Sequence, residues 1–446
     1  MISESYQYAT LNKMNVWLLT IGEPVPTNKD FKDRLHRAGY FARFLADYGH
    51  DVTWWTSTFD HFRKKHNFNF DTTIKLDENL KINLLFGGGY KSNVSLGRFI
   101  DHVKIAKKFD GKARLEKQKP DIIVCSLPTI ELCSVASKFG TQFNIPVLLD
   151  MRDMWPDIFV DTSPSLFKPV AKIALLPLFK LAKKACAGAT AITGVTEAFV
   201  DWGVKRAGRK RHELDRAFYL GYSVLEPDEE QIEAADKFWD EQGILSHSKS
   251  FNICFIGAIG RQFDFDTIIA VAKDIEKQKL PIKFVLCGSG DRLEYLTSIC
   301  ANQDNIIFPG WIDSSQIHNL MRRSAIGLNP LVDRYDFRSH INNKAIEYMS
   351  ASLPIFTTLT KGVLPDLLRK NNCGMCYPIG DHRALLDIIM KLYNDRSLLS
   401  TMRKNAFQLF TDCFDANIVY KDMMEHLIKI INYYSEQNKF VKVNDI

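Results

Sequence analysis

The chain has 446 residues, of which 46% are hydrophobic and 25% charged, a composition typical of a globular protein and unlike that of a disordered or collagenous chain. This length exceeds what one hydrophobic core usually holds, so two domains are expected. The net charge of +6 is too small to indicate nucleic-acid binding, and it suits an anionic small molecule or an anionic membrane surface.

Nine cysteines are scattered along the chain. Their odd number and irregular spacing argue against a disulfide framework and favour a reducing, cytoplasmic compartment. Cys373 and Cys376 form a CxxC pair with no second pair to complete a zinc site, so we interpret them as buried thiols beside a strand. Residues 1–13 are polar and lack the apolar segment of a signal peptide. No apolar run reaches the roughly 20 residues that span a bilayer.

Short apolar runs, each followed by a helix-like stretch, recur through the first half of the chain. Continuous apolar runs of this length are typical of strands buried on both faces of a parallel sheet. The predicted strands are 15–21, 51–57, 81–86, 121–127, 145–150 and 189–194.

This alternation of apolar runs and helix-like stretches is interrupted by a polar, acidic stretch and then resumes. The second set of predicted strands is 251–259, 282–288, 305–308, 325–331 and 353–358. Two such arrays predict an α/β protein with two doubly wound, Rossmann-like domains facing a central cleft. The predicted parts are an N-terminal domain (14–215), a linker (216–250), a second domain (251–412) and a C-terminal helix (413–446) that crosses back to the first domain.

The most informative segment is 339–354, SHINNKAIEYMSASLP. Asn342 and Asn343 suit the start of a helix that runs through Lys344 and Glu347. A helix start at the end of a strand offers backbone N–H groups and a positive dipole end to a phosphate. Lys344 adds a positive charge where that dipole disfavours one, and the carboxylate of Glu347 could accept both hydroxyls of a ribose. The alternative is a local ion pair between Lys344 and Glu347 on a solvated face.

At this segment the chain resembles glycosyltransferase family 4, whose members have the GT-B fold. NKAIEYMSASLPIF resembles the run with which that family binds a nucleotide sugar. Further segments resemble it in the same order, especially in bacterial members that assemble surface polysaccharides. They are GEPVPTNKDFKDRLHRAGYFARFLADYGHDVTWWTS (22–57), LLDMRDMWPD (148–157), AITGVTEAFVDWGV (191–204), FVLCGSGD (284–291) and FPGWIDSSQIHNLMRRSAIGLNPL (308–331).

The resemblance implies that 14–215 is the acceptor-side domain and 251–412 the nucleotide-sugar domain, and it assigns roles in donor binding. It implies that Glu347 holds the donor ribose, and that Lys344 with the backbone of Asn342 and Asn343 lies near the diphosphate. The family usually carries a second glutamate eight positions before this one, where the present chain has Ser339. Two further residues belong to the implied donor site. Arg261 is the nearest candidate for the family's diphosphate-binding arginine, and Gly288 lies at the end of the strand that carries the family's GxG.

In the first half, Gly22 ends the first predicted strand and permits close backbone approach to a donor or acceptor. The basic run Arg34, His36 and Arg37 follows it, either facing the cleft or starting a solvated helix. Arg152 and Asp153 stand near the place where many family members carry a His-Asp pair, and we take them as candidate catalytic residues. Asp150 and Asp157 are rivals of Asp153, and the alternative is a structural Arg–Asp pair.

Two basic regions remain. Residues 167–184, FKPVAKIALLPLFKLAKK, mix five lysines with apolar residues, as in a helix lying on an anionic membrane. Such a helix would place the protein at the inner face of the cytoplasmic membrane, where polyprenyl-diphosphate-linked acceptors of this family occur. Residues 205–216 could extend this patch or contact an acceptor pyrophosphate. The alternative for 167–184 is a half-buried helix whose lysines snorkel.

The resemblance implies a retaining glycosyltransferase that needs no metal and no cofactor. Its donor would be a nucleoside-diphosphate sugar, with UDP the family's commonest nucleotide, and its acceptor a glycan or a lipid-linked molecule. Cationic side chains and a helix N-terminus would then stabilise the negative charge of the leaving group. Two other functions stay open: a sugar-nucleotide 2-epimerase, and a non-catalytic binding protein with the same fold.

Overall fold

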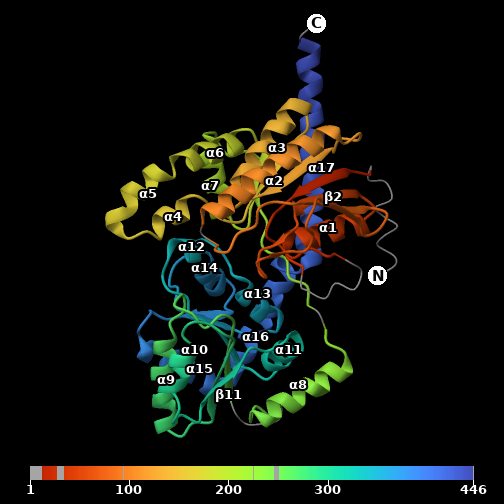
Figure 1. Cartoon of the computed structure of the whole chain (residues 1–446). Helices are drawn as coiled ribbons and strands as arrows, with labels where there is room; N and C mark the ends of the chain where they lie inside the picture. The colour runs from red at the N-terminus through yellow and green to blue at the C-terminus, as the bar shows by residue number, and fades with distance from the viewer. Residues whose placement is uncertain (1–12, 28–34, 94, 225, 246–250, 445–446) are drawn as a thin grey trace. The chain divides into compact units, whose positions relative to one another are not determined.

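A computed structural model of the chain describes residues 13–27, 35–93, 95–224, 226–245 and 251–444 (Figure 1). It consists of two compact units. The N-terminal unit comprises Met1–Tyr219 and Val419–Ile446, and the C-terminal unit comprises Leu220–Ile418. Among the described residues, none of the helices combines the length and apolarity that crossing a membrane requires.

The N-terminal unit is built on an eight-stranded sheet in the order β10-β9-β8-β7-β1-β2-β6-β5. All neighbouring strands are parallel except β5, which is antiparallel to β6. The strands are β1 (Asn15–Leu19), β2 (Asp51–Ser57), β5 (Thr72–Lys75), β6 (Leu80–Leu85), β7 (Ile122–Ser126), β8 (Val147–Met151), β9 (Ala191–Gly194) and β10 (Arg216–Ala217), with the separate hairpin β3 (Phe59–Asp60) and β4 (Lys65–His66).

Aromatic side chains fill the core between this sheet and its helices. The rings of Trp17 on β1 and Trp55 on β2 lie 5.4 Å apart, and both pack edge-on against Phe109 of α2. The helices are α1 (Arg37–Asp47), α2 (Leu96–Leu115), α3 (Ile130–Phe143), α4 (Asp157–Asp161), η1 (Ser165–Phe167), α5 (Lys168–Ala174), α6 (Leu176–Ala187) and α7 (Glu197–Ala207).

A last helix, α17 (Ala416–Asn444), is assigned to the N-terminal unit from Val419 onward. Its Tyr420 is fully buried and stacks on Tyr40 and Phe41 of α1. His426 contacts the carbonyl of Leu214 at 3.0 Å. The N-terminal unit is therefore made of two segments that are far apart in the sequence.

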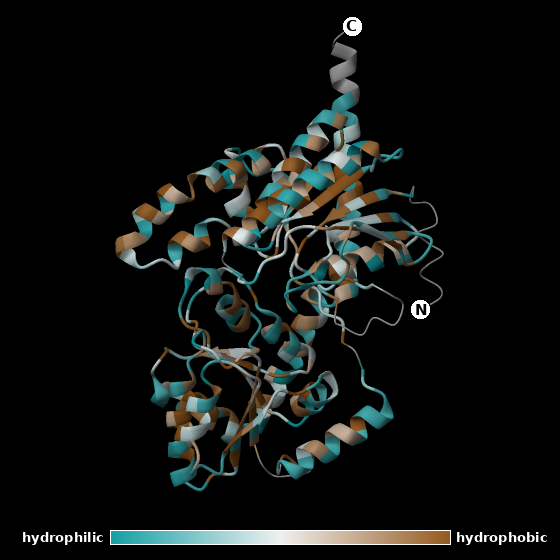
Figure 2. Cartoon of the chain, viewed as in Figure 1, coloured by the Kyte–Doolittle hydropathy of each residue, from teal (hydrophilic) through white to brown (hydrophobic). Residues whose placement is uncertain are grey.

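The C-terminal unit has a six-stranded, all-parallel sheet in the order β13-β12-β11-β14-β15-β16. Numbered within the unit, this is the order 3-2-1-4-5-6 of a Rossmann fold. The strands are β11 (Phe251–Ile256), β12 (Ile282–Cys287), β13 (Ile306–Gly310), β14 (Ile326–Asn329), β15 (Ile355–Thr357) and β16 (Gly374–Cys376). The central strands are mostly hydrophobic and almost fully buried (Figure 2), as expected for a parallel sheet with helices on both faces.

The helices of this unit are α8 (Glu229–Glu241), α9 (Phe265–Lys277), α10 (Leu293–Ile299), α11 (Ser314–Arg322), α12 (Tyr335–Ser339), α13 (Asn343–Ser350), α14 (Val363–Lys370), α15 (His382–Asn394) and α16 (Arg396–Cys413). Helix α8 lies inside the stretch 216–250 that we predicted to be a linker. Its Trp239 is fully buried and donates a hydrogen bond to the carbonyl of Gln316 in α11. Two of its acidic residues, Asp236 and Asp240, pair with Arg323 at the end of α11.

Candidate functional site

Several of the residues predicted to bind a donor lie around one point of the C-terminal sheet, whereas Gly22 lies in the N-terminal unit. Strands β11 and β14 are hydrogen-bonded neighbours, and the strand order reverses between them. In doubly wound sheets, ligands bind outside the carboxyl ends of the strands at this switch point. Ile256 ends β11 here, and Asn329 ends β14.

Helix α13 begins at this switch point. As predicted, Asn342 caps it, because its side-chain oxygen accepts a hydrogen bond from the backbone N–H of Ala345 at 3.1 Å. The amides of Asn342 and Asn329 also exchange two hydrogen bonds, of 2.9 and 3.3 Å. Asn329 is fully buried, so this exchange fixes the start of α13 to the end of β14.

Lys344 points from the first turn of α13 back toward β11. Its ammonium donates a hydrogen bond to the carbonyl of Ile256, and it lies 3.8 Å from the ring centroid of Phe255 and 4.8 Å from that of Phe263. Desolvation in this position lowers the pKa of Lys344 to about 7. Lys344, held at the end of β11, is therefore close to the midpoint of its titration at pH 7.

Two glycine turns leave backbone exposed beside Lys344. Gly257 follows β11 with φ +147°, and Gly288 follows β12 with φ +134°. A Cβ at Gly257 would lie 2.2 Å from the Lys344 ammonium, and a Cβ at Gly288 would lie 1.8 Å from the carbonyl oxygen of Gly257. Only glycine fits both turns, and this close packing of backbone is a feature of nucleotide-binding sheet ends.

The other predicted donor residues lie in the same unit. Glu347 is half-buried one helical turn after Lys344, and Asn343 is exposed as the first residue of α13. The side chain of Arg261 is 89% exposed and its Nε lies 3.3 Å from a carboxylate oxygen of Asp291, so it is available to turn toward a ligand. Ser339 is buried, and its hydroxyl donates to the carbonyl of Tyr335 at 2.8 Å.

Arg152 belongs to the N-terminal unit, where it is part of a buried ion network. Its guanidinium pairs with Glu23 and lies 2.8 Å from Asp150, and Arg37 reaches the same carboxylate at 2.9 Å. Burial opposes ionisation of Asp150, but the two arginines outweigh it and hold the pKa of that carboxyl well below its usual range. Glu23 in turn accepts hydrogen bonds from the first backbone amides of α1, those of Ala38 and Gly39. Arg152 therefore fixes the loop after β1 to the end of β8.

Other residues of the N-terminal unit lie at the carboxyl ends of its strands. Gly22 follows β1 with φ +91°, and a Cβ there would lie 3.8 Å from the His61 side chain. Asp153 follows β8, is partly exposed, and accepts a hydrogen bond from the backbone amide of Met154. Arg34 lies outside the described residues.

Three further residues of the N-terminal unit, His61, Tyr90 and Arg98, escaped the sequence analysis. His61 Nδ1 lies 2.6 Å from the Tyr90 hydroxyl. Desolvation, helped by nearby cations, lowers the pKa of His61 to about 4, so the ring is neutral at pH 7. The guanidinium of Arg98 lies 4.5 Å from the centroid of the Trp155 ring. The carboxylate of Asp153 attracts this guanidinium electrostatically. The glycine run at 87–89 that precedes Tyr90 was the available signal.

Residues 237–409, which lie in the C-terminal unit, match the family model described as Glycosyl transferases group 1. The comparison with curated proteins gave no match.

Several solved structures are similar over nearly the whole chain. Sucrose-phosphate synthase from Thermosynechococcus elongatus has a TM-score of 0.69 and 15% identity, over 94% of this chain and 100% of that chain. HepE from Anabaena in complex with UDP has a TM-score of 0.62 and 15% identity, over 93% and 100%. The catalytic domain of starch synthase IV from Arabidopsis thaliana, bound to ADP and acarbose, has a TM-score of 0.65 and 11% identity, over 94% and 100%. These likenesses show the GT-B fold, which is built of two Rossmann-like domains.

Proposed function

We propose that the chain is a retaining, metal-independent glycosyltransferase of family 4. It moves a sugar from a nucleoside-diphosphate sugar, with UDP as the nucleotide, to a glycan or lipid-linked acceptor in surface polysaccharide synthesis. The observation that carries the proposal is the convergence of Lys344, the Asn342–Asn329 pair and two glycine turns at the switch point of the C-terminal sheet. This point lies inside the segment that matches the group 1 model.

The diphosphate of the donor is the group that this switch point suits. Backbone amides at the start of α13 and the Lys344 ammonium would face its negative charge, and Arg261 would swing from Asp291 to complete the contact. When the glycosidic bond to the diphosphate breaks, charge grows on the leaving oxygen. Lys344, already held in place, would stabilise that charge without reorganisation.

Glu347 would hold the ribose of the donor. It follows Lys344 by three positions on α13, so both side chains lie on one face of that helix. A carboxylate accepts two hydroxyl groups at once, which fits the 2′- and 3′-hydroxyls of a nucleotide.

Asp153 would bind hydroxyls of the acceptor in the N-terminal unit. Its position after β8, beside Arg98, supports this role. Arg152 acts through the loops that it holds, since its own guanidinium is engaged with Asp150 and Glu23.

The test begins with a thermal-shift screen of UDP, ADP and GDP, because a ligand that binds only the native state raises the melting temperature. Sugars linked to the nucleoside diphosphate that binds best are then tested as donors in the presence of EDTA. The anomeric configuration of the product is read by NMR. Net inversion, or loss of activity with EDTA, would contradict the mechanism. Epimer formation without any acceptor would favour the epimerase, and nucleotide binding without turnover would favour a binding protein.

A further inference from the structure

The loop that follows β6 places a buried tyrosine at the carboxyl edge of the N-terminal sheet. Asp101 of α2 is fully buried and accepts hydrogen bonds of 2.7 and 2.8 Å from the backbone amides of Gly88 and Gly89 in this loop. These contacts fix the backbone immediately before Tyr90, which is buried. Three basic side chains lie against Tyr90 and form with it what we call the Tyr90 cluster: His61, Lys64 and Arg98.

Two members of the cluster are cations that lie close to the same ring. The Lys64 ammonium is 5.0 Å and the Arg98 guanidinium 5.6 Å from the centroid of the Tyr90 ring. Both also contact Asn93, because Lys64 donates a hydrogen bond to its side-chain oxygen and Arg98 donates one of 2.9 Å to its backbone carbonyl. The two charges are therefore neighbours, and desolvation together with repulsion by Arg98 lowers the pKa of Lys64.

Neither cation forms an ion pair with any carboxylate in the part of the chain that the structure describes. Asp60 attracts Lys64 without pairing with it, and Asp153 and Glu131 attract Arg98 in the same way. The Nε of Arg98 is buried and has no hydrogen-bond partner among the described residues, and desolvation lowers the pKa of this guanidinium. Because an uncompensated charge in a partly buried position is costly, an anion bound beside it would be stabilised.

The cluster lies where this sheet can bind a ligand. The strand order of the N-terminal unit reverses at β1, whose neighbours are β2 and β7. Gly22 follows β1, and a Cβ there would lie 3.8 Å from the His61 side chain. On the other side of the reversal, Arg98 lies against the ring of Trp155, in the segment that follows β8. The cluster therefore borders the carboxyl ends of strands on both sides of the switch point.

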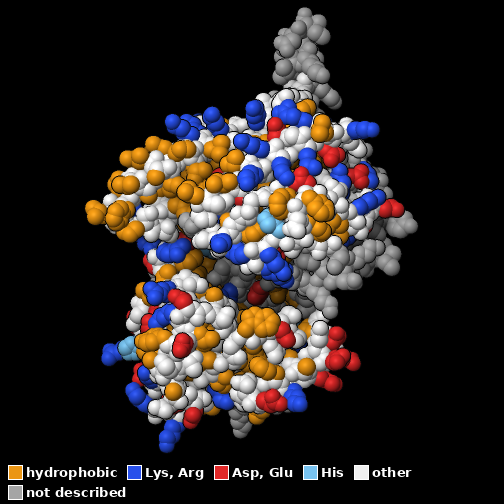
Figure 3. Space-filling view, in the orientation of Figure 1, with side chains coloured by type: hydrophobic (Ala, Val, Ile, Leu, Met, Phe, Trp, Pro, Cys, Tyr) orange, Lys and Arg blue, Asp and Glu red, His pale blue; other side chains and the backbone are white. Residues whose placement is uncertain are grey.

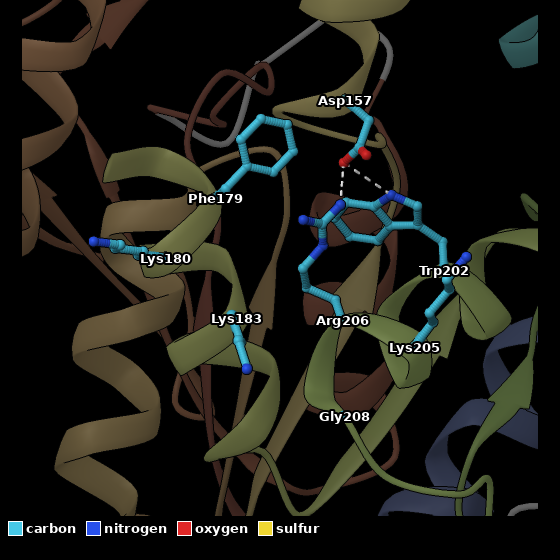
Figure 4. Close-up of a pocket in the computed structure, with 8 residues that line it drawn as sticks. All are labelled: Asp157, Phe179, Lys180, Lys183, Trp202, Lys205, Arg206 and Gly208. Carbon is cyan, nitrogen blue, oxygen red and sulfur yellow. Dashed lines mark hydrogen bonds and ion pairs between the residues drawn. The ribbon is translucent and has the colours of Figure 1, made fainter. Parts of the chain in front are cut away.

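Other basic side chains of this unit are arranged differently. Lysines and arginines are dispersed over the face of the unit that Figure 3 shows, so charge alone marks no site there. In the pocket between α6 and α7, Arg206 pairs with Asp157 and the three lysines point in different directions (Figure 4). Arg209, in the segment after α7, pairs with the buried Asp215. These cations are paired or point apart, whereas those of the Tyr90 cluster are unpaired and close together.

We propose that Arg98 and Lys64 bind a phosphate group of the acceptor and so select acceptors that carry one. A phosphate monoester or a diphosphate carries about two negative charges at pH 7, which matches two neighbouring cations better than a carboxylate does. A guanidinium can also bind two phosphate oxygens at once. The role in acceptor selection rests on the proposed transfer reaction, whereas phosphate binding is tested without it.

The binding test is calorimetric titration of the full chain, with the nucleoside diphosphate that binds best kept in excess to fill the donor site. Glucose 1-phosphate and geranyl diphosphate present a phosphate on a sugar and on a lipid, and the one that binds more tightly identifies the kind of acceptor. Glucuronate, which carries one carboxylate, should bind roughly 10-fold more weakly than the better of the two. Equal or tighter binding of glucuronate, or no binding of either phosphate, would overturn the proposal.

Substitutions then locate the phosphate. Arg98→Gln and Lys64→Gln should each weaken its binding by roughly 10-fold or more, because each removes a charge-assisted contact. Arg98→Lys keeps the charge but not the planar fork and should recover part of the loss. Circular dichroism checks folding, and Lys64→Gln decides the matter if Arg98→Gln does not fold. The matched control is Lys107→Gln/Lys138→Gln, which removes charge from two exposed positions of the same unit and should bind as the parent does. An equal loss in this control would reduce the effect to net charge and overturn the site.

Transfer kinetics separate this inference from the proposed function. With an acceptor that supports transfer, Arg98→Gln should raise the KM for the acceptor and leave the KM for the donor unchanged. Transfer to an uncharged acceptor that Arg98→Gln does not affect would overturn the inference and leave the proposed function intact. Phosphate binding that depends on Arg98, in a chain that transfers no sugar, would retain the site and overturn the proposed function.

Discussion

The ammonium of Lys344 lies 3.8 Å from the ring centroid of Phe255, and desolvation there lowers the pKa of Lys344 to about 7. A diphosphate beside it would favour the charged form. Above pH 7 the lysine must take up a proton when UDP binds, so UDP affinity should fall by up to about tenfold per pH unit. Calorimetry in buffers of different ionisation enthalpy measures both the affinity and the proton uptake. A pH-independent affinity between pH 6 and 9 would contradict this role of Lys344.

Replacing Lys344 by methionine should lower the affinity for UDP without lowering the free energy of unfolding. The variant removes a desolvated cation from an aromatic environment, so its free energy of unfolding should stay equal or increase. UDP affinity should fall by roughly 10- to 100-fold, because one charge-assisted contact is worth about 1.5–3 kcal/mol. Lys273→Met, at an exposed position, is the control that should change neither. A destabilised variant with unchanged UDP affinity would mean that Lys344 is structural.

The ribose contact of Glu347 is tested by a double-mutant cycle. Glu347→Gln should weaken UDP binding by roughly 10-fold or more, since it loses hydrogen bonds to a charged acceptor. With 2′,3′-dideoxy-UDP the same substitution should have little effect, because the partner hydroxyls are missing. Calorimetric titration of both proteins with both nucleotides gives the coupling energy. A coupling near zero would remove Glu347 from the ribose.

Gly288 is expected to tolerate no side chain. A Cβ there would lie 1.8 Å from the Gly257 carbonyl oxygen, so Gly288→Ala should lower the free energy of unfolding by about 3 kcal/mol or more. Gly380 also has a positive φ, of +78°, but a Cβ added there would meet nothing within 4 Å. Gly380→Ala should therefore cost only about 1 kcal/mol. Urea denaturation of the two variants compares them directly.

The buried ion network predicts a large effect at Asp150. Asp150→Asn leaves Arg37 and Arg152 without their shared anion, and breaking a buried pair typically costs about 3–5 kcal/mol. The exposed pair Arg216–Asp422 lies in the same unit, and Asp422→Asn should cost about 0–1 kcal/mol. Tryptophan fluorescence during urea denaturation reports on both. Equal effects would show that the buried network contributes little.

The sequence predicted the strand framework well because buried parallel strands have continuous apolar runs. The run 51–57 coincides with β2, and 282–288 contains β12. Strand β5 was missed, since its half-exposed residues give no such run. Asn342 as a helix cap was predictable from residue type, but its pairing with Asn329 was not, because the two come together only when β14 and α13 meet. The inward direction of Lys344 depends in the same way on Phe255 and Phe263.

Helix α17 has a consequence for synthesis of the chain. The C-terminal unit occupies one continuous segment, Leu220–Ile418, whereas the N-terminal unit needs Tyr420 and its neighbours to cover α1. During translation, the last residue of the C-terminal unit is therefore added before the N-terminal unit has received all of its residues. The unit that is translated first must keep the surface of Tyr40 and Phe41 uncovered until α17 emerges. A chain that ended before residue 419 would contain every residue of the C-terminal unit but only part of the N-terminal unit.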